Sequence, residues 1–219
     1  MTAPLVELRN IHFAYDAARP VLVNLDLAIA PGERIGLSGA NGGGKTTLLH
    51  LIVGLVKPTS GDIVCFGSPR KTESDFAEVR RRVGLLFQDS DDQLFCPTVA
   101  EDIAFGPLNL GKTRGETAAI VARTLDAVGL PGYEDRITYK LSGGEKRLVA
   151  LATVLAMEPE VLLLDEPLTG LDEEHERRVS AVLAGLPQAM LIVSHDVVFL
   201  NNSTQRVKRL VRGSLYAHS

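Results

Sequence analysis

The stretch Gly39-Ala40-Asn41-Gly42-Gly43-Gly44-Lys45-Thr46 decides the fold of this chain. It fits the pattern G-x-x-x-x-G-K-[ST], in which a glycine-rich turn points backbone N–H groups at phosphate oxygens. An apolar run at 35–37 precedes it, and a helical pattern follows it, with one apolar face made of Leu48, Leu51, Ile52 and Leu55. A phosphate-binding loop needs this order of strand, turn and helix. The stretch therefore predicts a nucleoside triphosphate site in an α/β fold.

The residues that end the loop have separate tasks. The Lys45 ammonium brings a full positive charge to the phosphates, and the Thr46 hydroxyl can ligate Mg²⁺. We also assign nucleotide binding to Thr47, the next residue in the chain. The helix that starts here is expected to add the positive end of its dipole. The expected ligand is a nucleoside triphosphate with Mg²⁺.

A second pattern, Val161-Leu162-Leu163-Leu164-Asp165-Glu166, is an apolar strand that ends in two acids. A buried strand of this kind can deliver Asp165 to the Mg²⁺ ion. Glu166 can then face the γ-phosphate and polarise the attacking water, which makes it the general-base candidate. Seen alone, the pattern would be an acidic strand end at a turn. Together with the phosphate-binding loop, it favours hydrolysis of the nucleotide.

The rest of the chain predicts strands on both sides of a helical region. Residues 1–37 alternate apolar and polar side chains, which predicts antiparallel strands, and a change of phase at Asn10 suggests a bulge. Further strands are expected at 62–66, 83–87, 160–164, 189–193 and 206–211. Between Phe87 and Glu160 the patterns are helical, and capping boxes at 98–101 and 142–145 mark two helix starts.

These patterns predict a P-loop NTPase core with a mixed, mostly parallel sheet. An antiparallel N-terminal β-subdomain and an inserted α-helical subdomain complete the expected fold. The predicted nucleotide-binding core comprises residues 1–88 and 157–219, and the predicted helical subdomain comprises residues 89–156. Together they form one domain of 219 residues.

Composition and charge exclude several function classes. Apolar residues make up 45% and charged residues 23% of the chain, which is ordinary for a soluble protein. The most apolar stretches, 148–157 and 161–164, are far shorter than the roughly 20 residues that cross a bilayer. A net charge of −4 gives no reason to expect DNA or RNA as a partner. Two cysteines, Cys65 and Cys96, and an N-terminus without a signal-peptide pattern favour a reducing, cytoplasmic setting.

The most diagnostic pattern is Leu141-Ser142-Gly143-Gly144-Glu145, which precedes the strand that ends in Asp165. With this pattern the chain resembles the ATPase subunits of ATP-binding cassette (ABC) transporters. The resemblance covers nearly the whole chain and its motifs in order: the A-loop at Tyr15, Walker A at 39–46, the Q-loop at Gln88, the signature at 141–145, Walker B at 161–166, the D-loop at Asp172 and the switch histidine at His195. The departures are Glu145 for the usual Gln, Thr46 for the commoner Ser, and Leu168 for the usual Thr.

The resemblance implies ATP and Mg²⁺ as ligands and a role for each motif. Tyr15 would stack on the adenine, His195 would contact the γ-phosphate and help to position Glu166, and Gln88 would reach the Mg²⁺ and water region. By pattern alone, Tyr15 is a core or edge-strand aromatic. His195 would be a structural or solvated histidine at a strand end, and Gln88 would open a polar surface loop. The N–H groups that open the signature helix form a second anion site. In the family this site acts in trans, on the γ-phosphate held by a second copy, so that two ATPs lie head to tail.

The residues after the Q-loop narrow the resemblance to one branch. The run from Phe87 to Gly111 looks like the energy-coupling factor importers and is closest to the cobalt and nickel uptake ATPases, although vitamin importers share most of these letters. Apolar residues near the Q-loop are expected to receive the coupling helices of a membrane partner. The residues assigned to this docking patch are Leu94, Phe95 and Phe105, with an acidic rim of Asp91, Asp92 and Asp102.

The chain is therefore interpreted as the energising ATPase subunit of a Co²⁺ or Ni²⁺ importer, with vitamin import as the alternative. It would lie peripherally at the cytoplasmic face of the cell membrane. Its expected partners are a second copy in a homodimer, a transmembrane coupling subunit and a substrate-binding membrane component. The 24 residues after His195, with a hairpin around Arg212 and Gly213, are expected to leave no room for a further C-terminal domain.

Two other functions fit the sequence less well. A soluble ABC-fold ATPase that acts on DNA or in translation ordinarily has two cassettes, a long coiled-coil insertion or a basic surface, and the sequence contains none of these. A subunit that binds nucleotide without hydrolysing it is disfavoured because Lys45, Glu166 and His195 are intact.

Overall fold

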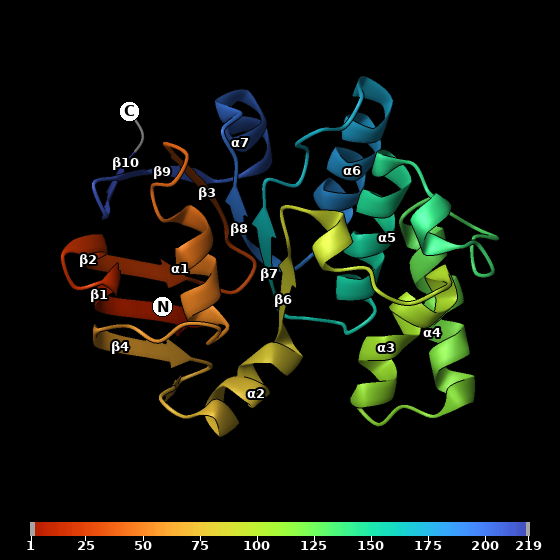
Figure 1. Cartoon of the computed structure of the whole chain (residues 1–219), viewed down its shortest axis with the longest axis horizontal. Helices are drawn as coiled ribbons and strands as arrows, with labels where there is room; N and C mark the ends of the chain where they lie inside the picture. Colours follow the sequence, from red (N-terminus) through yellow and green to blue (C-terminus); the bar gives the residue numbers. More distant parts are fainter. Residues whose placement is uncertain (1–2, 218–219) are drawn as a thin grey trace. The chain divides into compact units, whose positions relative to one another are not determined.

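A computed structural model of the chain describes residues 3–217, which divide into two compact units (Figure 1). The first unit contains the described residues up to Leu85, together with Glu160–Asp165 and the described residues from Pro187 onward. The second unit contains Leu86–Pro159 and Glu166–Leu186. The predicted limits of a helical subdomain, 89–156, stay a prediction. Within residues 3–217, no helix is both long and apolar enough to cross a bilayer.

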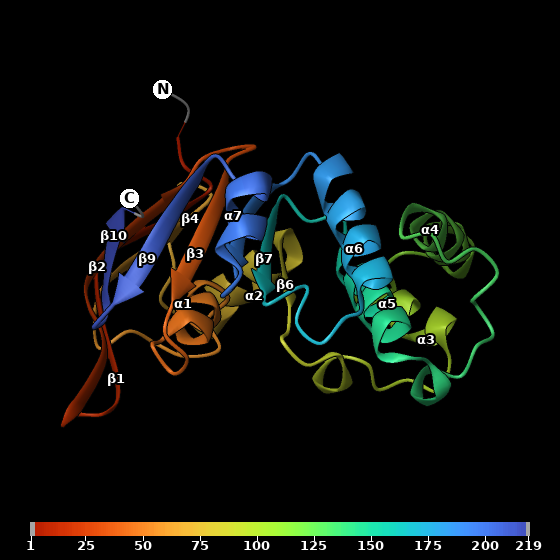
Figure 2. The same cartoon turned by 90° about the horizontal axis from the view of Figure 1, so that it is seen from above.

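A six-stranded sheet forms the centre of the first unit, with the strand order β10-β9-β3-β8-β7-β6. β3 pairs in parallel with β8 and with β9, which runs alongside it in Figure 2. β7 is also parallel to β8, whereas β10 returns antiparallel to β9. The bounds are β3 (Arg34–Gly39), β6 (Val83–Leu86), β7 (Val161–Asp165), β8 (Ala189–Val193), β9 (Arg206–Val211) and β10 (Ser214–Ala217). The sheet is mixed and mostly parallel, which confirms the predicted fold class.

The central strands of this sheet are apolar and buried. Every residue of β7 and β8 is buried, as expected for parallel strands that are covered on both faces. Helix α1 (Lys45–Ile52) contacts β3 and β7, and helix α7 (Val197–Ser203) contacts β3 and β9. Because β3 and β7 both run parallel to β8, their carboxyl ends lie at the same edge of the sheet. Ligands of open α/β sheets bind at this edge.

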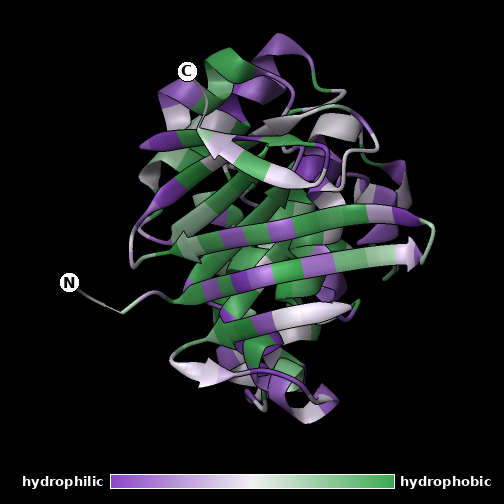
Figure 3. Cartoon of the chain, turned by 90° about the vertical axis from the view of Figure 1, so that its left-hand side faces the viewer, coloured by the Kyte–Doolittle hydropathy of each residue, from purple (hydrophilic) through white to green (hydrophobic). Residues whose placement is uncertain are grey.

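A second, antiparallel sheet has the strand order β2-β1-β4-β5. Its strands are β1 (Val6–Asp16), β2 (Arg19–Ile29), β4 (Ser60–Cys65) and β5 (Ser68–Pro69). In Figure 3, hydrophilic and hydrophobic residues alternate along the long strands, which is typical of a sheet with one face on the core. The bulge that the sequence suggested is present. Asn10 has a φ of 50°, and the pairing register shifts between Leu8 and Ile11.

Helix α2 (Glu73–Arg82) was not predicted from the sequence. It is mostly polar, and only Phe76 and Val79 are buried, so it has a weak apolar periodicity. Its start is a capping box between Thr72 and Asp75. Hydrogen bonds from the backbone N–H groups of Thr72 and Lys71 lower the pKa of the Asp75 carboxyl to about 2.

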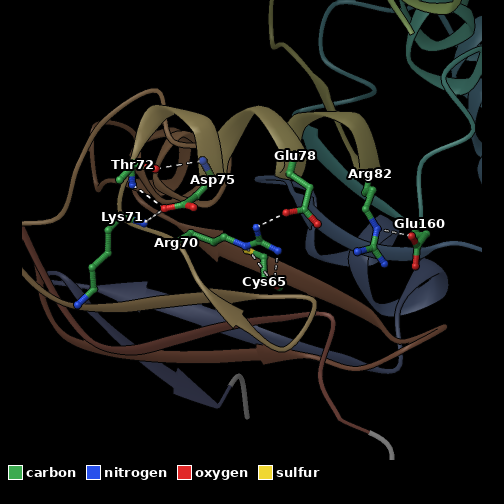
Figure 4. A network of polar contacts seen from close by, with 8 residues as sticks. All are labelled: Cys65, Arg70, Lys71, Thr72, Asp75, Glu78, Arg82 and Glu160. Carbon is green, nitrogen blue, oxygen red and sulfur yellow. Dashed lines mark hydrogen bonds and ion pairs between the residues drawn. The ribbon is translucent and has the colours of Figure 1, made fainter. Parts of the chain in front are cut away.

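A buried arginine ties α2 to the antiparallel sheet. Figure 4 shows the Arg70 guanidinium between the Glu78 carboxylate on α2 and the Cys65 carbonyl at the end of β4. Nη1 lies 2.5 Å from Glu78 Oε2, while Nε and Nη2 donate to the Cys65 oxygen at 3.2 and 3.0 Å. Arg82, near the end of α2, pairs with Glu160 at 2.6 Å. These contacts compensate for the small apolar face of α2.

The second unit is built from helices. Its main elements are η1 (Ser90–Asp92), α3 (Val99–Asn109), α4 (Arg114–Ala127), η2 (Thr138–Lys140), α5 (Gly143–Leu155) and α6 (Glu173–Gly185). Helix α5 contacts α3, α4 and α6. The predicted capping boxes are present, formed by Thr98 with Glu101 and by Ser142 with Glu145. The predicted helical character of the region between Phe87 and Glu160 is therefore confirmed.

Candidate nucleotide site

The phosphate-binding loop connects β3 to α1 in the first unit. Gly44 is the N-cap of α1 and has a φ of 100°, a backbone conformation that favours glycine. An added Cβ at Gly44 would also lie 2.8 Å from Cγ1 of Val21. The Lys45 ammonium folds over the loop and donates to the carbonyl oxygens of Gly39 at 2.9 Å and Ala40 at 3.1 Å. The loop of residues 39–46 thus brings several backbone N–H groups and the Lys45 ammonium close together.

The first residues of α1 meet the end of β7. The Thr46 hydroxyl donates to Oδ2 of Asp165 at 2.6 Å, and the Asp165 side chain is buried. Hydroxyl and carboxylate oxygens are the hard ligands that Mg²⁺ prefers. In the part of the chain that the structure describes, no cluster of three or more His, Cys, Asp or Glu residues could hold a metal ion. The hydroxyl of Thr46 and the carboxylate of Asp165 would suit Mg²⁺, which usually takes one or two protein oxygens and its other ligands from phosphate and water.

Tyr15, near the end of β1, lies next to the start of α1. Its hydroxyl is 3.2 Å from Oγ1 of Thr47, and its ring meets Phe13 edge to face at 4.7 Å between centroids. The ring remains 67% exposed. An exposed aromatic face beside a phosphate-binding loop is suited to stacking on a base.

His195 lies in the connection between β8 and α7 and is exposed. Its neighbours hold the backbone in place. The Ser194 N–H donates to the Leu37 carbonyl on β3 at 3.2 Å, and Asp196 caps α7 by accepting from the N–H of Phe199 at 3.0 Å. The predicted position at the end of a strand is confirmed.

Glu166 and Gln88 belong to the second unit. Glu166 follows β7, is buried, and has a φ of 48°, which is uncommon for a residue with a Cβ. Its Oε2 accepts from the hydroxyl of Thr169 at 3.3 Å. The backbone carbonyls of Gln88 and Glu166 both accept hydrogen bonds from Arg147 on α5. Sequence reasoning missed Arg147, although a charged residue on the apolar face of that helix was a signal.

The signature residues open α5. Ser142 is the N-cap, and its N–H donates to the Glu145 carboxylate at 2.8 Å. The other oxygen of Glu145 accepts from the Tyr133 hydroxyl at 2.7 Å. These hydrogen bonds, with that of the Ser142 N–H the largest, hold the pKa of the Glu145 carboxyl below its ordinary 4.5. The Glu145 carboxylate, which replaces the usual Gln, thus accepts hydrogen bonds from two donors in the second unit.

The signature and the D-loop are in contact within the second unit. Asp172 is the N-cap of α6 and accepts from the N–H of His175 at 2.9 Å, while its Oδ1 lies 2.8 Å from His175 Nδ1. The His175 ring packs on the backbone of Gly144, so that an added Cβ there would lie 2.2 Å from the ring. His175 was not among the predicted site residues, since nothing in the sequence relates it to Gly144.

The structure corrects the predicted docking patch in part. The rings of Phe95 and Phe105 are 67% and 49% exposed and meet edge to face at 4.9 Å, but Leu94 is buried. Asp102 is also buried, because it accepts from the N–H groups of Phe95 and Cys96 and from the hydroxyl of Thr138. It is therefore a structural acceptor and no part of an acidic rim. The other rim residues, Asp91 and Asp92, are exposed, and Asp91 pairs with Lys146 at 2.6 Å.

The predicted site residues are thus divided between the units. The first unit brings together Tyr15 and Thr47, and Thr46 with Asp165, around the phosphate-binding loop. It also contains His195. The second unit contains the Q-loop, the signature, Glu166 and Asp172.

Known sequences resemble this chain along nearly its whole length. The profile of the family described as ABC transporter matches residues 22–169. A protein of Brucella suis named as an ABC transporter ATP-binding protein is 52% identical over 97% of this chain and 88% of its own length. The energy-coupling factor transporter ATP-binding protein EcfA of Methanothermobacter thermautotrophicus is 42% identical over 97% of this chain and 70% of its own length.

Solved structures share the fold. The structure of CbiO1 from Clostridium perfringens, part of the ABC transporter complex CbiONQ, has a TM-score of 0.88 at 30% identity and covers 98% of this chain and 87% of that one. A dimeric ATP-binding cassette in a post-hydrolysis state, bound to ADP and Pi, has a TM-score of 0.87 at 25% identity and covers 97% of this chain and 98% of its own.

Proposed function

Since this chain belongs to the ABC transporter family and is similar to the ATP-binding proteins of energy-coupling factor transporters, we propose that it is the ATPase subunit that energises an importer of that type. The observation that carries the proposal is the 2.6 Å contact between Thr46 and Asp165 beside the loop that holds Lys45. It brings together two predicted Mg²⁺ ligands that are 119 residues apart in the sequence, which supports an ATP site here.

ATP would be held by the loop of residues 39–46 and by Thr47. The loop N–H groups and Lys45 would bind the phosphates, and Tyr15 would stack on the adenine. Mg²⁺, held by Thr46 and Asp165, would neutralise charge on the β and γ phosphates when bound. The exposed ring of Tyr15 and the burial of Asp165 support these assignments.

Hydrolysis would depend on Glu166, with Gln88 and His195 as further contributors. A carboxylate next to the γ-phosphate can accept a proton from water and orient the water for in-line attack. The family resemblance assigns Glu166 this role. The positive φ of Glu166 supports it, because strained residues are concentrated at functional sites.

Two copies of the chain would work together. The N–H groups at the start of α5, opened by Ser142, Gly143 and Gly144, would bind the γ-phosphate of ATP held by the other copy. Asp172 would lie in the D-loop between the copies. The dimeric cassette among the similar structures supports a dimer of this kind.

The membrane partner would bind the second unit. Phe95 and Phe105 form an exposed aromatic pair close in sequence to the Q-loop, and patches of this kind mark interaction sites. Coupling helices of a transmembrane subunit are the proposed occupant. The chain would then be a peripheral protein at the cytoplasmic face of the membrane, with a substrate-binding membrane component in the same complex.

The cargo proposed is Co²⁺ or Ni²⁺, because the run from Phe87 to Gly111 resembles that of the cobalt and nickel uptake ATPases. Cells that express the chain with its membrane partners should accumulate radiolabelled Co²⁺ or Ni²⁺. Accumulation of a vitamin in place of the metals would assign the chain to the vitamin importers. Uptake of either cargo should fall in a Phe95→Ala/Phe105→Ala variant if these rings bind the membrane partner.

The ATPase assignment is tested with the purified chain. Glu166→Gln should reduce turnover to a small residual rate and accumulate an ATP-bound dimer, measured by phosphate release and by light scattering after size-exclusion chromatography. Glu174→Gln, an exposed acid at the start of α6, is the matched control and should hydrolyse ATP like the wild type. Undiminished turnover in Glu166→Gln would remove Glu166 from the role of general base.

A further inference from the structure

Arg147, in the second turn of α5, is an arginine with almost no contact with solvent. Only 2% of its surface is exposed. A buried guanidinium is costly unless acceptors satisfy its N–H groups. Three backbone carbonyls serve as acceptors here, with Nη1 donating to Phe87 at 2.6 Å and Nη2 donating to Gln88 at 2.7 Å and to Glu166 at 2.9 Å. One side chain therefore joins two segments that are almost 80 residues apart in the sequence.

The two segments are those that the proposed function uses. Phe87 and Gln88 begin the Q-loop directly after β6, and Glu166 is the general-base candidate directly after β7. The Glu166 backbone is in the left-handed region, with a φ of 48°. Such a conformation is unfavourable for a residue with a Cβ and persists only where surrounding contacts impose it. The hydrogen bond from Arg147 to the Glu166 carbonyl is one such contact.

The Q-loop is attached to α5 by further side chains. Gln93 accepts from the N–H of Phe87 at 3.1 Å and donates to the Ala150 carbonyl and the Thr153 hydroxyl, both at 2.8 Å. Asp91 pairs with Lys146 at 2.6 Å. The segment from 87 to 93 is thus held against α5 at several points, and Arg147 extends this set of contacts to Glu166.

We propose that Arg147 is a positioning residue for ATP hydrolysis. It holds the Glu166 backbone in the conformation that directs the carboxylate toward the attacking water. By binding the Gln88 carbonyl as well, it fixes the position of Glu166 relative to the Q-loop. The planar guanidinium suits this task because its N–H groups point in several directions at once, whereas a lysine ammonium is a compact point charge. The assignment rests on the proposed role of Glu166 as general base.

The test is Arg147→Lys, which retains the positive charge but lacks the planar guanidinium with its several N–H donors. Misdirection of a general base lowers the rate and leaves the phosphate-binding loop intact, so kcat should fall about 10- to 100-fold. The KM for ATP should stay within about twofold of the wild-type value, because it reports binding contacts that the ground state and the transition state share. Titration with a fluorescent ATP analogue gives the concentration of binding-competent protein, so that kcat refers only to folded molecules.

A double variant separates positioning from general damage. Glu166→Gln has no carboxylate for Arg147 to direct, so adding Arg147→Lys should leave its residual rate unchanged. The effects of two substitutions on kcat do not add when the two residues act as a unit. Arg123→Lys is the matched control in the same unit. Its side chain is 62% exposed and pairs with Glu158, so its kcat and KM should equal those of the wild type.

Several outcomes would overturn the assignment. Equal loss in the wild-type and Glu166→Gln backgrounds, or a rise in KM as large as the fall in kcat, would make Arg147 a purely structural residue. So would failure of both Arg147→Lys and Arg147→Gln to bind the ATP analogue. Undiminished turnover by Glu166→Gln itself would instead refute the proposed function, and this result is obtained without any change at Arg147.

Discussion

Thr46 is the residue on which metal dependence should be most visible. Its hydroxyl, at the start of α1, donates to the Asp165 carboxylate, and both oxygens are proposed as ligands of Mg²⁺. Removal of one ligand weakens Mg²⁺ binding but leaves the charge of Lys45 in place. ATP binding and metal binding can therefore be separated by single substitutions at this point.

We expect Thr46→Val to raise the Mg²⁺ concentration needed for half-maximal hydrolysis by about tenfold or more, since each ligand contributes strongly to metal affinity. Thr46→Ser retains the hydroxyl and should behave like the wild type. Chelation of Mg²⁺ with EDTA should stop hydrolysis by all three proteins. The measurement is phosphate release against Mg²⁺ concentration, and an unchanged requirement in Thr46→Val would exclude the hydroxyl as a ligand.

Glu145 should make stability depend on pH. Its folded-state pKa is below the ordinary 4.5, because the Ser142 N–H and the Tyr133 hydroxyl stabilise the charged form. The contribution is therefore fully present above pH 4.5 and is lost as the pH falls through the folded-state pKa. Glu145→Gln should be less stable than the wild type at pH 7 by roughly 0.5–1 kcal/mol, the usual effect of a negative charge at a helix N-terminus.

Urea unfolding of both proteins across the acidic range measures this effect. The gap in the free energy of unfolding should close as the pH falls below 4.5, when the wild-type carboxyl also becomes neutral. A gap that stays constant with pH would show that the difference does not come from the charge of Glu145. Tyr133→Phe removes one of the two donors and should reduce the pH dependence.

At the scale of elements, the starts of α5 and α6 are packed together through one close contact. The His175 ring of α6 occupies the space beside Gly144 of α5, and His175 also binds the D-loop residue Asp172. The start of α5 and the start of α6 are therefore coupled through the His175 side chain. A residue larger than glycine at position 144 must displace the ring.

We expect Gly144→Ala to lower the free energy of unfolding by about 1–3 kcal/mol, the usual cost of overpacking. Gly143→Ala is the control, because an added Cβ there meets no atom within 4 Å. In a Gly144→Ala/His175→Ala variant the clash is absent, so the two effects should not add. Thermal or urea unfolding of the wild type, Gly144→Ala, His175→Ala and the double variant gives the coupling energy. Strict additivity would contradict the contact.

At the scale of the whole molecule, the two anion sites of a chain are proposed to serve different nucleotides. Lys45 would bind the ATP of its own copy, and the start of α5 would bind that of the second copy. A chain with one of these sites destroyed can then still contribute the other. This arrangement makes mixed dimers informative.

Lys45→Ala and Ser142→Arg should each be inactive alone. A mixture should regain part of the wild-type hydrolysis, because one composite site of each mixed dimer combines an intact Lys45 with an intact Ser142. The control mixture, Lys45→Ala with Lys45→Ala/Ser142→Arg, contains no intact site and should stay inactive. If the first mixture also fails to hydrolyse ATP while mixed dimers form, the signature does not act in trans.

Features that depend on local sequence were the ones that could be predicted. The capping boxes at Thr98 and Ser142 involve residues three apart, and the phosphate-binding loop is one continuous stretch, so their patterns are complete in the sequence. Helix α2 was missed because only Phe76 and Val79 of its residues are buried. Its position depends instead on Arg70 and its partners, which are polar contacts without periodicity.

The sequence by itself determined the chemistry: a phosphate-binding loop, a strand that delivers Asp165 and Glu166, and a signature that opens a helix. Tertiary structure alone decided the environment of the single side chains. Asp102 is buried and accepts hydrogen bonds from two backbone N–H groups and a hydroxyl. Glu145 accepts from the Tyr133 hydroxyl, and Arg147 donates to the carbonyls of Gln88 and Glu166. The physical reason is that a motif is recognised from neighbours along the chain. Burial and hydrogen bonding depend on residues that only folding brings within reach.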